Sequence, residues 1–270
     1  MTAARTHSTD AKADAAGDAL VAALKDKVDG EVRFDRGARA TYSTDASNYR
    51  QVPIGVVLPR SIDAVVATVA VCREHRVPVL ARGGGTSLAG ECCNAAVIMD
   101  LSKYCHSLVS LDTGASSAIV EPGIVLDELN ARLAEHKLCV GPKPSTHPTC
   151  TIGGMIGNNS CGSTAQAYGT MSDSVLRMEI LTYDGVRMWV GPTSDEEYER
   201  ILAGGGRKAE IYRELRRIRD DYMSEIRTRY PKIPRRVSGY NLDSLLPENS
   251  FNVATALVGS ESTLVTVLRA

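Results

Sequence analysis

The chain has 270 residues, of which 43% are hydrophobic and 23% are charged, and its formal net charge is −1. This near-neutral balance excludes a global attraction to nucleic acid, and no apolar run reaches the roughly 18 residues that a membrane span needs. The first residues lack the apolar region of a secretory signal, so we expect a cytoplasmic protein without a membrane span.

The cysteines and histidines form no metal-site or disulfide pattern. There are seven cysteines, an odd number with irregular spacing, and no Cys-x-x-Cys pair occurs. The five histidines include no His-x-x-x-His pair. We therefore expect neither a disulfide framework nor a metal site in this chain.

Residues 1–50 are expected to form an N-terminal extension with one helix, because Leu20, Leu24 and Val28 recur at helical spacing. From residue 51 strands and helices follow in mixed order, and Ser61 is placed to cap a helix. The expected helices lie at residues 61–75, 125–138 and about 207–227. The expected strands lie at residues 55–59, 77–81, 95–102, 107–112, 116–123 and 264–268, with a hairpin around Asp184 and Gly185 in residues 175–190.

This order of elements predicts an α+β fold, because strands and helices do not alternate strictly as they do in a doubly wound sheet. We expect two lobes within one domain at residues 51–270. The first lobe is placed at about residues 51–112 and the second at about residues 113–270.

A glycine-rich loop follows the expected strand at residues 77–81, where residues 82–90 read RGGGTSLAG. Three consecutive glycines allow positive φ and close backbone approach, so successive N–H groups can form a nest for an anionic oxygen. The loop is not a Walker loop, because no Lys follows Gly90, and Leu88 replaces the third glycine of a Rossmann fingerprint. A tight turn without a ligand is the alternative interpretation.

A second glycine-rich segment, residues 151–162, reads TIGGMIGNNSCG. Its glycines allow the backbone to lie against a planar ligand, and Asn158 and Asn159 carry donors and acceptors suited to a ring edge or a pyrophosphate. The alternative is a glycine-rich helix start that packs closely on its neighbour. Two such loops indicate a ligand with two separated recognition points, and FAD has this shape.

Several segments, in order along residues 56–270, resemble the FAD-binding module of the vanillyl-alcohol-oxidase flavoproteins, which have the p-cresol methylhydroxylase-type fold. Within this group the chain is most similar to the D-lactate, glycolate and D-2-hydroxyglutarate dehydrogenase branch. The segment SGYNLDSLLPEN is similar to large members that carry an iron–sulfur region farther along the chain. The other segments are VPVLARGGGTSLAG, VEPGIVLDELN, GPKPSTHPTCTIGGMIGNNSCGS, YGTMSDSVLRMEILTYDG and ALVGSESTLVTVL.

The resemblance implies that FAD is the cofactor. Residues 82–90 would wrap its pyrophosphate, and the 151–162 segment with the preceding Pro-rich loop would line the flavin. Thr86 stands where some members attach FAD through a His, so the flavin is expected to be non-covalent. The residues expected to bind FAD are Arg82, Gly83, Gly84, Gly85, Thr86, Ser87, Gly90, Pro144, Ser145, Thr151, Gly153, Gly154, Gly157, Asn158, Asn159 and Gly162.

Two departures from the family pattern stand out. Ser262 replaces the second glycine of G-[ST]-E-G-T-L, which costs about 1 kcal/mol if that position needs positive φ. The family's substrate-cap domain, with its catalytic His and metal-binding residues, would lie beyond Ala270. We therefore expect the cap domain to be absent, with a downstream cap or iron–sulfur region, or a partner subunit, completing the enzyme. The catalytic residues stay unknown: His147 is the only His near the expected flavin, and the sequence shows no His–carboxylate constellation.

Residues 207–236 hold eleven Lys and Arg against five Asp and Glu. We expect a helix here with Ile211, Leu215, Ile218 and Tyr222 on its apolar stripe. Its basic side would be either a solvated surface or an electrostatic guide for an acidic substrate, a partner subunit or an anionic membrane surface. The second interpretation leaves peripheral membrane association open.

The resemblance implies oxidation of a small 2-hydroxy acid with hydride transfer to flavin N5. Two alternatives stay open. One is a non-catalytic FAD-binding subunit or truncated remnant. The other is an NADPH-dependent reductase of the same fold, such as the enolpyruvyl-sugar reductase of cell-wall synthesis.

Overall fold

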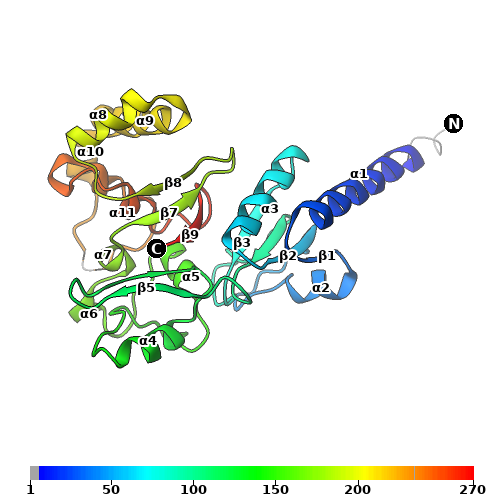
Figure 1. The fold of residues 1–270 in the computed structure, drawn as a ribbon, viewed down its shortest axis with the longest axis horizontal. Helices are drawn as coiled ribbons and strands as arrows, with labels where there is room; N and C mark the ends of the chain where they lie inside the picture. The colour runs from blue at the N-terminus through cyan, green and yellow to red at the C-terminus, as the bar shows by residue number, and fades with distance from the viewer. Residues whose placement is uncertain (1–5, 234) are drawn as a thin grey trace. The chain divides into compact units, whose positions relative to one another are not determined.

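The computed structural model describes residues 6–233 and 235–270 (Figure 1). The chain divides into two compact units, Met1–Tyr104 and Cys105–Ala270, and each is considered by itself below. The boundary lies ahead of the position near residue 112 expected from the sequence. The reason is local, because residues 108–112 form a strand that pairs with the strand at residues 117–120 of the second unit.

The first unit is a four-stranded sheet with strand order β1-β2-β4-β3, in which β2, β4 and β3 are parallel and β1 is antiparallel to β2. Strand β1 belongs to the expected N-terminal extension, yet it is an edge strand of this sheet, with Gly30 opposite Pro59. The helix expected in the extension is α1, which begins at Thr6. The elements are α1 (Thr6–Lys27), β1 (Gly30–Arg33), α2 (Arg36–Thr41), β2 (Gly55–Pro59), α3 (Ile62–Glu74), β3 (Val79–Arg82) and β4 (Val97–Asp100).

The core of the first unit contains the apolar residues that recur at helical spacing in α1 and those of the apolar run in β2. Leu20 and Leu24 of α1 are buried in one cluster with Val57 of β2 and Val71 of α3. Ser61 caps α3 as expected, because its hydroxyl accepts a hydrogen bond from the Ala64 N–H at 3.1 Å. Strand β2 is buried along its whole length, as its continuous apolar run predicted.

The second unit contains a two-stranded sheet, β5-β6, and a three-stranded antiparallel sheet, β8-β7-β9. The predicted hairpin around Asp184 and Gly185 is confirmed, with Met178 opposite Val190. The elements are β5 (Leu108–Asp112), β6 (Ser117–Val120), α4 (Leu126–Ala134), α5 (Ile152–Gly157), α6 (Ala165–Tyr168), α7 (Met171–Ser174), β7 (Met178–Leu181), β8 (Arg187–Val190), α8 (Asp195–Gly204), α9 (Gly206–Asp221), α10 (Met223–Arg229), η1 (Leu242–Leu245), η2 (Pro247–Asn249), α11 (Val253–Leu257) and β9 (Thr266–Arg269).

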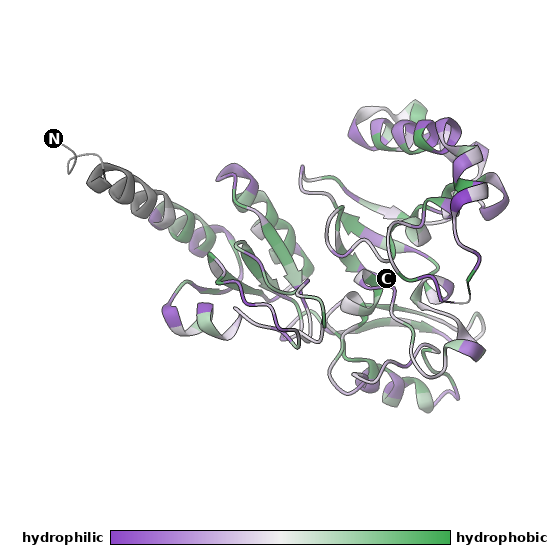
Figure 2. Cartoon of the chain, turned by 180° about the vertical axis from the view of Figure 1, so that it is seen from behind, coloured by the Kyte–Doolittle hydropathy of each residue, from purple (hydrophilic) through white to green (hydrophobic). Residues whose placement is uncertain are grey.

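The basic segment after residue 206 forms α9 and α10, whose surfaces are largely hydrophilic (Figure 2). The expected apolar stripe is wrong at Tyr222, which is 55% exposed because α9 ends at Asp221. Acidic neighbours pair with many of the basic side chains, which weakens the interpretation of this segment as an electrostatic guide. These pairs include Arg207–Asp184, Arg216–Asp195, Arg217–Asp221, Arg227–Glu248 and Arg236–Asp243. Over residues 6–233 and 235–270, no helix has both the length and the apolar character to cross a membrane.

The G-[ST]-E-S-T-L segment places two non-glycine residues in left-handed backbone conformation. Glu261 has φ 50° and Ser262 has φ 61°. The condition for strain at Ser262 is therefore met, because the backbone at this position has positive φ.

Replacement Ser262→Gly should raise the free energy of unfolding by about 0.5–1 kcal/mol, since relief of the strain exceeds the extra entropy of the unfolded chain. Urea denaturation measures this difference. Ser163→Gly, at an exposed position without positive φ, is the matched control and should not stabilise the protein. Equal effects of the two changes would contradict the assignment of strain to residue 262.

Candidate cofactor-binding site

The first loop leaves the end of β3 with its backbone donors unused. Of the three consecutive glycines only Gly85 has positive φ, at 64°, and Gly90 has φ 86°. Within the described part of the chain, the N–H groups of Gly83, Gly84, Gly85 and Thr86 donate to no protein acceptor, whereas the Ser87 N–H faces the Cys92 sulfur. Successive free N–H groups on a glycine backbone form the kind of nest that binds an anionic oxygen. The residues present thus fit a phosphate group.

The Arg82 guanidinium supports the loop through hydrogen bonds to backbone carbonyl groups. Its guanidinium donates to the carbonyl oxygens of Thr44 at 2.9 Å and Cys92 at 3.0 Å, with a longer bond to the Tyr42 carbonyl at 3.4 Å. A Cβ atom on Gly85 would lie 2.6 Å from Arg82 Nη2. The glycine therefore allows the loop to close over the arginine that supports it.

Asp45 and Ser87 fix the far side of the same loop. Asp45 accepts hydrogen bonds from the N–H groups of Ser47 at 2.9 Å and Cys92 at 3.3 Å. Burial by itself would raise the pKa of Asp45, but a hydrogen bond from the Ser47 hydroxyl, together with those from the two N–H groups, outweighs it and lowers the pKa, so the carboxylate stays charged. The buried Ser87 hydroxyl accepts from the N–H groups of Ala89 and Glu91, and it thus serves the loop's own shape.

Glu91, which sequence reasoning missed, carries a buried oxygen without a protein partner. Among the described residues, its Oε2 atom receives no hydrogen bond. A buried carboxylate oxygen without a donor is costly, and a hydroxyl group of a bound molecule would satisfy it. The loop thus offers free N–H donors and one orphaned acceptor.

Half of the second glycine segment forms the short helix α5. Thr151 caps it, because the threonine hydroxyl accepts from the Gly154 N–H at 3.3 Å. The helix buries Ile152 and Ile156 and leaves Gly154 exposed. A Cβ atom on Gly153 would lie 2.6 Å from Pro122. At this glycine the alternative interpretation therefore applies: the helix packs closely on its neighbour.

The residues after α5 divide between shaping the segment and facing solvent. Asn159 is 1% exposed, and its Oδ1 atom accepts from the Ser172 N–H at 3.0 Å, so this oxygen holds the chain in shape. Gly162 has φ 136°, and a Cβ atom there would lie 2.0 Å from the carbonyl oxygen of Lys143. The close approach of Gly162 to Lys143 joins the second segment to the Pro-rich loop. Asn158 and Ser145 are exposed.

A histidine–carboxylate pair joins the Pro-rich loop to α4, and the expectation that the chain has none is wrong. His147 Nδ1 lies 2.9 Å from Asp127 Oδ1 and 2.7 Å from Oδ2. Asp127 lies in the first turn of α4, twenty positions before His147, and no sequence pattern linked the two. The carboxylate favours the tautomer with hydrogen on Nδ1, which leaves Nε2 as a possible acceptor.

Replacement Asp127→Asn should keep a hydrogen-bonding group beside His147 but remove the charge, whereas Asp127→Ala removes both. Because the pair ties the Pro-rich loop to α4, we expect FAD to bind about threefold to tenfold more weakly in the alanine variant, as for the loss of one ordinary hydrogen bond. Equilibrium dialysis of FAD measures the change. Glu128→Ala, on the same helix turn, is the control. An unchanged dissociation constant in Asp127→Ala would remove this loop from the cofactor site.

The two loops belong to different units: residues 82–90 lie in the first and residues 151–162 in the second. A sequence model described as "FAD binding domain" matches residues 53–191. The chain belongs to this FAD-binding domain family. FAD is therefore its cofactor, as predicted, and the two-lobed α+β fold of the p-cresol methylhydroxylase type is confirmed.

Named relatives match the chain over a longer stretch. The chain is 32% identical over 245 residues to a D-2-hydroxyglutarate dehydrogenase of Pseudomonas putida, which covers 89% of this chain and 24% of that protein. It is 32% identical over 163 residues to glycolate oxidase subunit GlcD of Bacillus subtilis, covering 59% of this chain and 35% of that subunit. The chain thus spans about a quarter of the length of the D-2-hydroxyglutarate dehydrogenase it matches.

Solved structures agree in fold. An alkyldihydroxyacetonephosphate synthase superposes with a TM-score of 0.60 at 18% identity, covering 88% of this chain and 36% of that one. A BBE-like 1 variant from Physcomitrella patens superposes with a TM-score of 0.57 at 20% identity, covering 68% of this chain and 40% of that one. At these identities the likeness supports the fold alone.

Proposed function

We propose that this chain is the FAD-binding part of a dehydrogenase of small 2-hydroxy acids of the D-lactate, glycolate or D-2-hydroxyglutarate type. The observation that carries the proposal is the similarity to D-2-hydroxyglutarate dehydrogenase over 89% of the chain. The relatives' names identify oxidation of an α-hydroxyl group as the shared chemistry.

Each loop has a separate task in this proposal. The N–H groups of Gly83 to Thr86 bind the pyrophosphate of a non-covalent FAD, with Arg82 and Asp45 holding the loop in shape. Gly154, Asn158 and Ser145 present exposed groups to the flavin, while Gly153, Asn159 and Gly162 fix the backbone that carries them. The bound FAD supplies the two-electron redox chemistry.

Proton transfer and substrate orientation need groups beyond this binding machinery. We propose that the catalytic base and the clamp for the substrate carboxylate come from polypeptide outside these 270 residues, such as a cap or iron–sulfur region or a partner subunit. The greater length of the relatives supports this part of the proposal. A positioned base contributes about 10²–10⁴ in rate, so its absence decides whether turnover is seen.

The test mixes D-lactate, glycolate or D-2-hydroxyglutarate anaerobically with the FAD-loaded chain and follows bleaching of the flavin. We expect slow bleaching by the chain alone and fast bleaching once polypeptide corresponding to the rest of a longer relative is supplied. Fast bleaching by the D-isomer alone, lost in His147→Ala, would place the base in this chain. Bleaching by NADPH but by no hydroxy acid would favour the reductase of the same fold and overturn the proposed function.

A further inference from the structure

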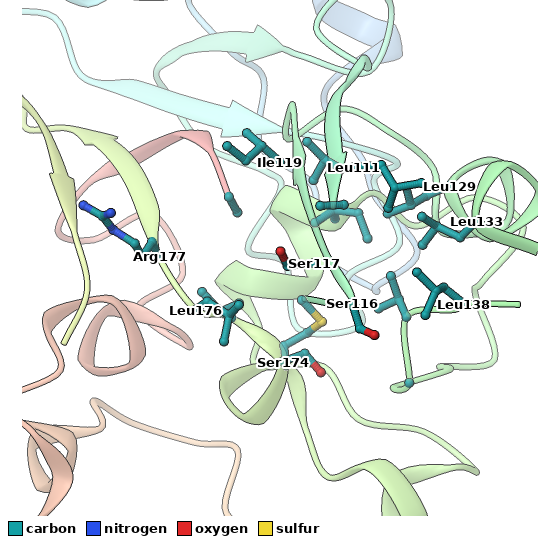
Figure 3. Close-up of a pocket in the computed structure, with 18 of the residues that line it drawn as sticks. Leu111, Ser116, Ser117, Ile119, Leu129, Leu133, Leu138, Ser174, Leu176 and Arg177 are labelled. Atoms are coloured by element: carbon teal, nitrogen blue, oxygen red, sulfur yellow. The ribbon is translucent and has the colours of Figure 1, made fainter. Parts of the chain in front are cut away.

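The second unit contains a cavity that the proposed function does not use. Its volume is about 750 Å³, and its walls come from β5, β6, α4, α5, α7 and β8 (Figure 3). Helix α5 contributes Ile152 and Ile156, whereas the exposed Gly154 proposed to face the flavin is not among the lining residues. The cavity is therefore distinct from the cofactor-facing side of α5.

The walls of the cavity are mainly apolar, as in a protein core with one layer missing. Leu129, Leu133 and Leu138 lie on one side in Figure 3, with Leu176 on another. Leu176 is 63% exposed and adds to the apolar lining. Apolar walls of this kind favour apolar side chains as occupants.

One edge of β6 opens on this cavity with unused backbone groups. On its other edge β6 pairs with β5, and over the described chain its sheet has only these two strands. At the open edge, Val120 N–H donates to the Ala270 carbonyl at 2.8 Å and Ala270 N–H donates to the Val120 carbonyl at 3.1 Å. Such a reciprocal pair is one rung of an antiparallel ladder.

The geometry of this rung fixes where the next one would form. Backbone groups alternate along a strand, so the N–H and carbonyl of Ala118 point to the same open edge as those of Val120. A strand running on from Ala270 would place its second residue opposite Ala118, near the start of β6 at Ser117. Ala118 packs on the buried core, so the second residue, and the fourth residue on the same face of the new strand, would turn their side chains into the cavity.

We propose that the cavity is a strand-docking groove, and that its occupant is a polypeptide strand that continues β9, with apolar side chains at alternate positions. The paired Ala270 lies in the wall of the groove, which gives this strand its direction and register. The match covers only 24% of the D-2-hydroxyglutarate dehydrogenase, so this relative contains further polypeptide from which such a strand could come. Docking would cover the apolar walls and satisfy the edge of β6.

The test adds a short C-terminal extension to the 270-residue chain, with apolar residues at its second and fourth positions and threonines between them. The first control carries Lys at those two positions, and the second carries Pro at the second position, which removes the N–H that faces the Ala118 carbonyl. Two readouts report docking. One is hydrogen exchange of the Ala118 amide, and the other is emission of Trp189, the single Trp of the chain, which lines the groove.

We expect the apolar extension to slow exchange of the Ala118 amide at least about tenfold and to shift Trp189 emission to the blue, with neither effect in the Lys and Pro controls. Equal behaviour of the apolar and Pro extensions would overturn the proposal. An Ala118 amide already protected in the chain without extension would overturn it as well. FAD binding is not part of either readout, so this result is independent of the proposed function.

Discussion

Replacement of Gly85 by valine should abolish retention of FAD. Gly85 has φ 64°, a conformation that a β-branched residue adopts only with strain, and its Cβ position lies 2.6 Å from Arg82 Nη2. The valine would displace the guanidinium that holds the Thr44 and Cys92 carbonyls, so the free N–H groups would lose their common direction. We expect the dissociation constant of FAD to rise at least about 100-fold, which equals about 2.8 kcal/mol.

Thr86→Val is the matched comparison at the next position. It removes one hydroxyl group without changing the loop's backbone, so we expect weakening by only about 0.5–1.5 kcal/mol. Gly84→Val fills the exposed side of the nest without a positive φ, and it should also prevent FAD retention. Fluorescence titration of FAD distinguishes these effects. Parent-like binding by both glycine variants would mean that the phosphates bind elsewhere.

Glu179→Leu should be among the most destabilising single changes in the second unit. Glu179 lies on β7, the central strand of its sheet, and its side chain is only 8% exposed. It accepts hydrogen bonds from Arg187 Nε at 2.6 Å and from Arg269 Nη1 at 2.5 Å. Removal of the carboxylate leaves two partly buried guanidinium groups without their shared partner, and we expect a loss of about 2–4 kcal/mol.

Glu179→Gln separates the charge from the hydrogen bonds, because the amide oxygen still accepts while the charge is gone. We expect this variant to lose roughly half as much stability, since only charge-assisted strength is removed. Urea unfolding followed by circular dichroism measures both. A loss below about 0.5 kcal/mol in Glu179→Leu would show that the arginines find other partners at no cost.

The sequence predicted the elements whose signals are local. Ser61 marked the start of α3, the apolar run before Arg82 marked β3, and the Asp184–Gly185 pair marked the β7–β8 turn. The first glycine loop was also located correctly, because consecutive glycines have few uses other than unusual backbone geometry. These features depend on residues adjacent in the chain.

Contacts between distant residues could not be read in this way. Arg82 donates to the carbonyl of Thr44, and His147 meets Asp127 on another element. Asn159 was predicted to face the ligand, but the turn after α5 buries it against Ser172. Side-chain direction at these sites depends on how elements pack, and no periodicity in the sequence encodes it.

The most direct test of the proposed cofactor site is titration of the purified 270-residue chain with FAD and, separately, with FMN. We expect a yellow protein that binds FAD, releases it intact on denaturation, and binds FMN at least about tenfold more weakly, because the nest of residues 83–86 is assigned to the pyrophosphate that FMN lacks. A folded, colourless chain that ignores added FAD, or one that binds FMN equally well, would contradict it.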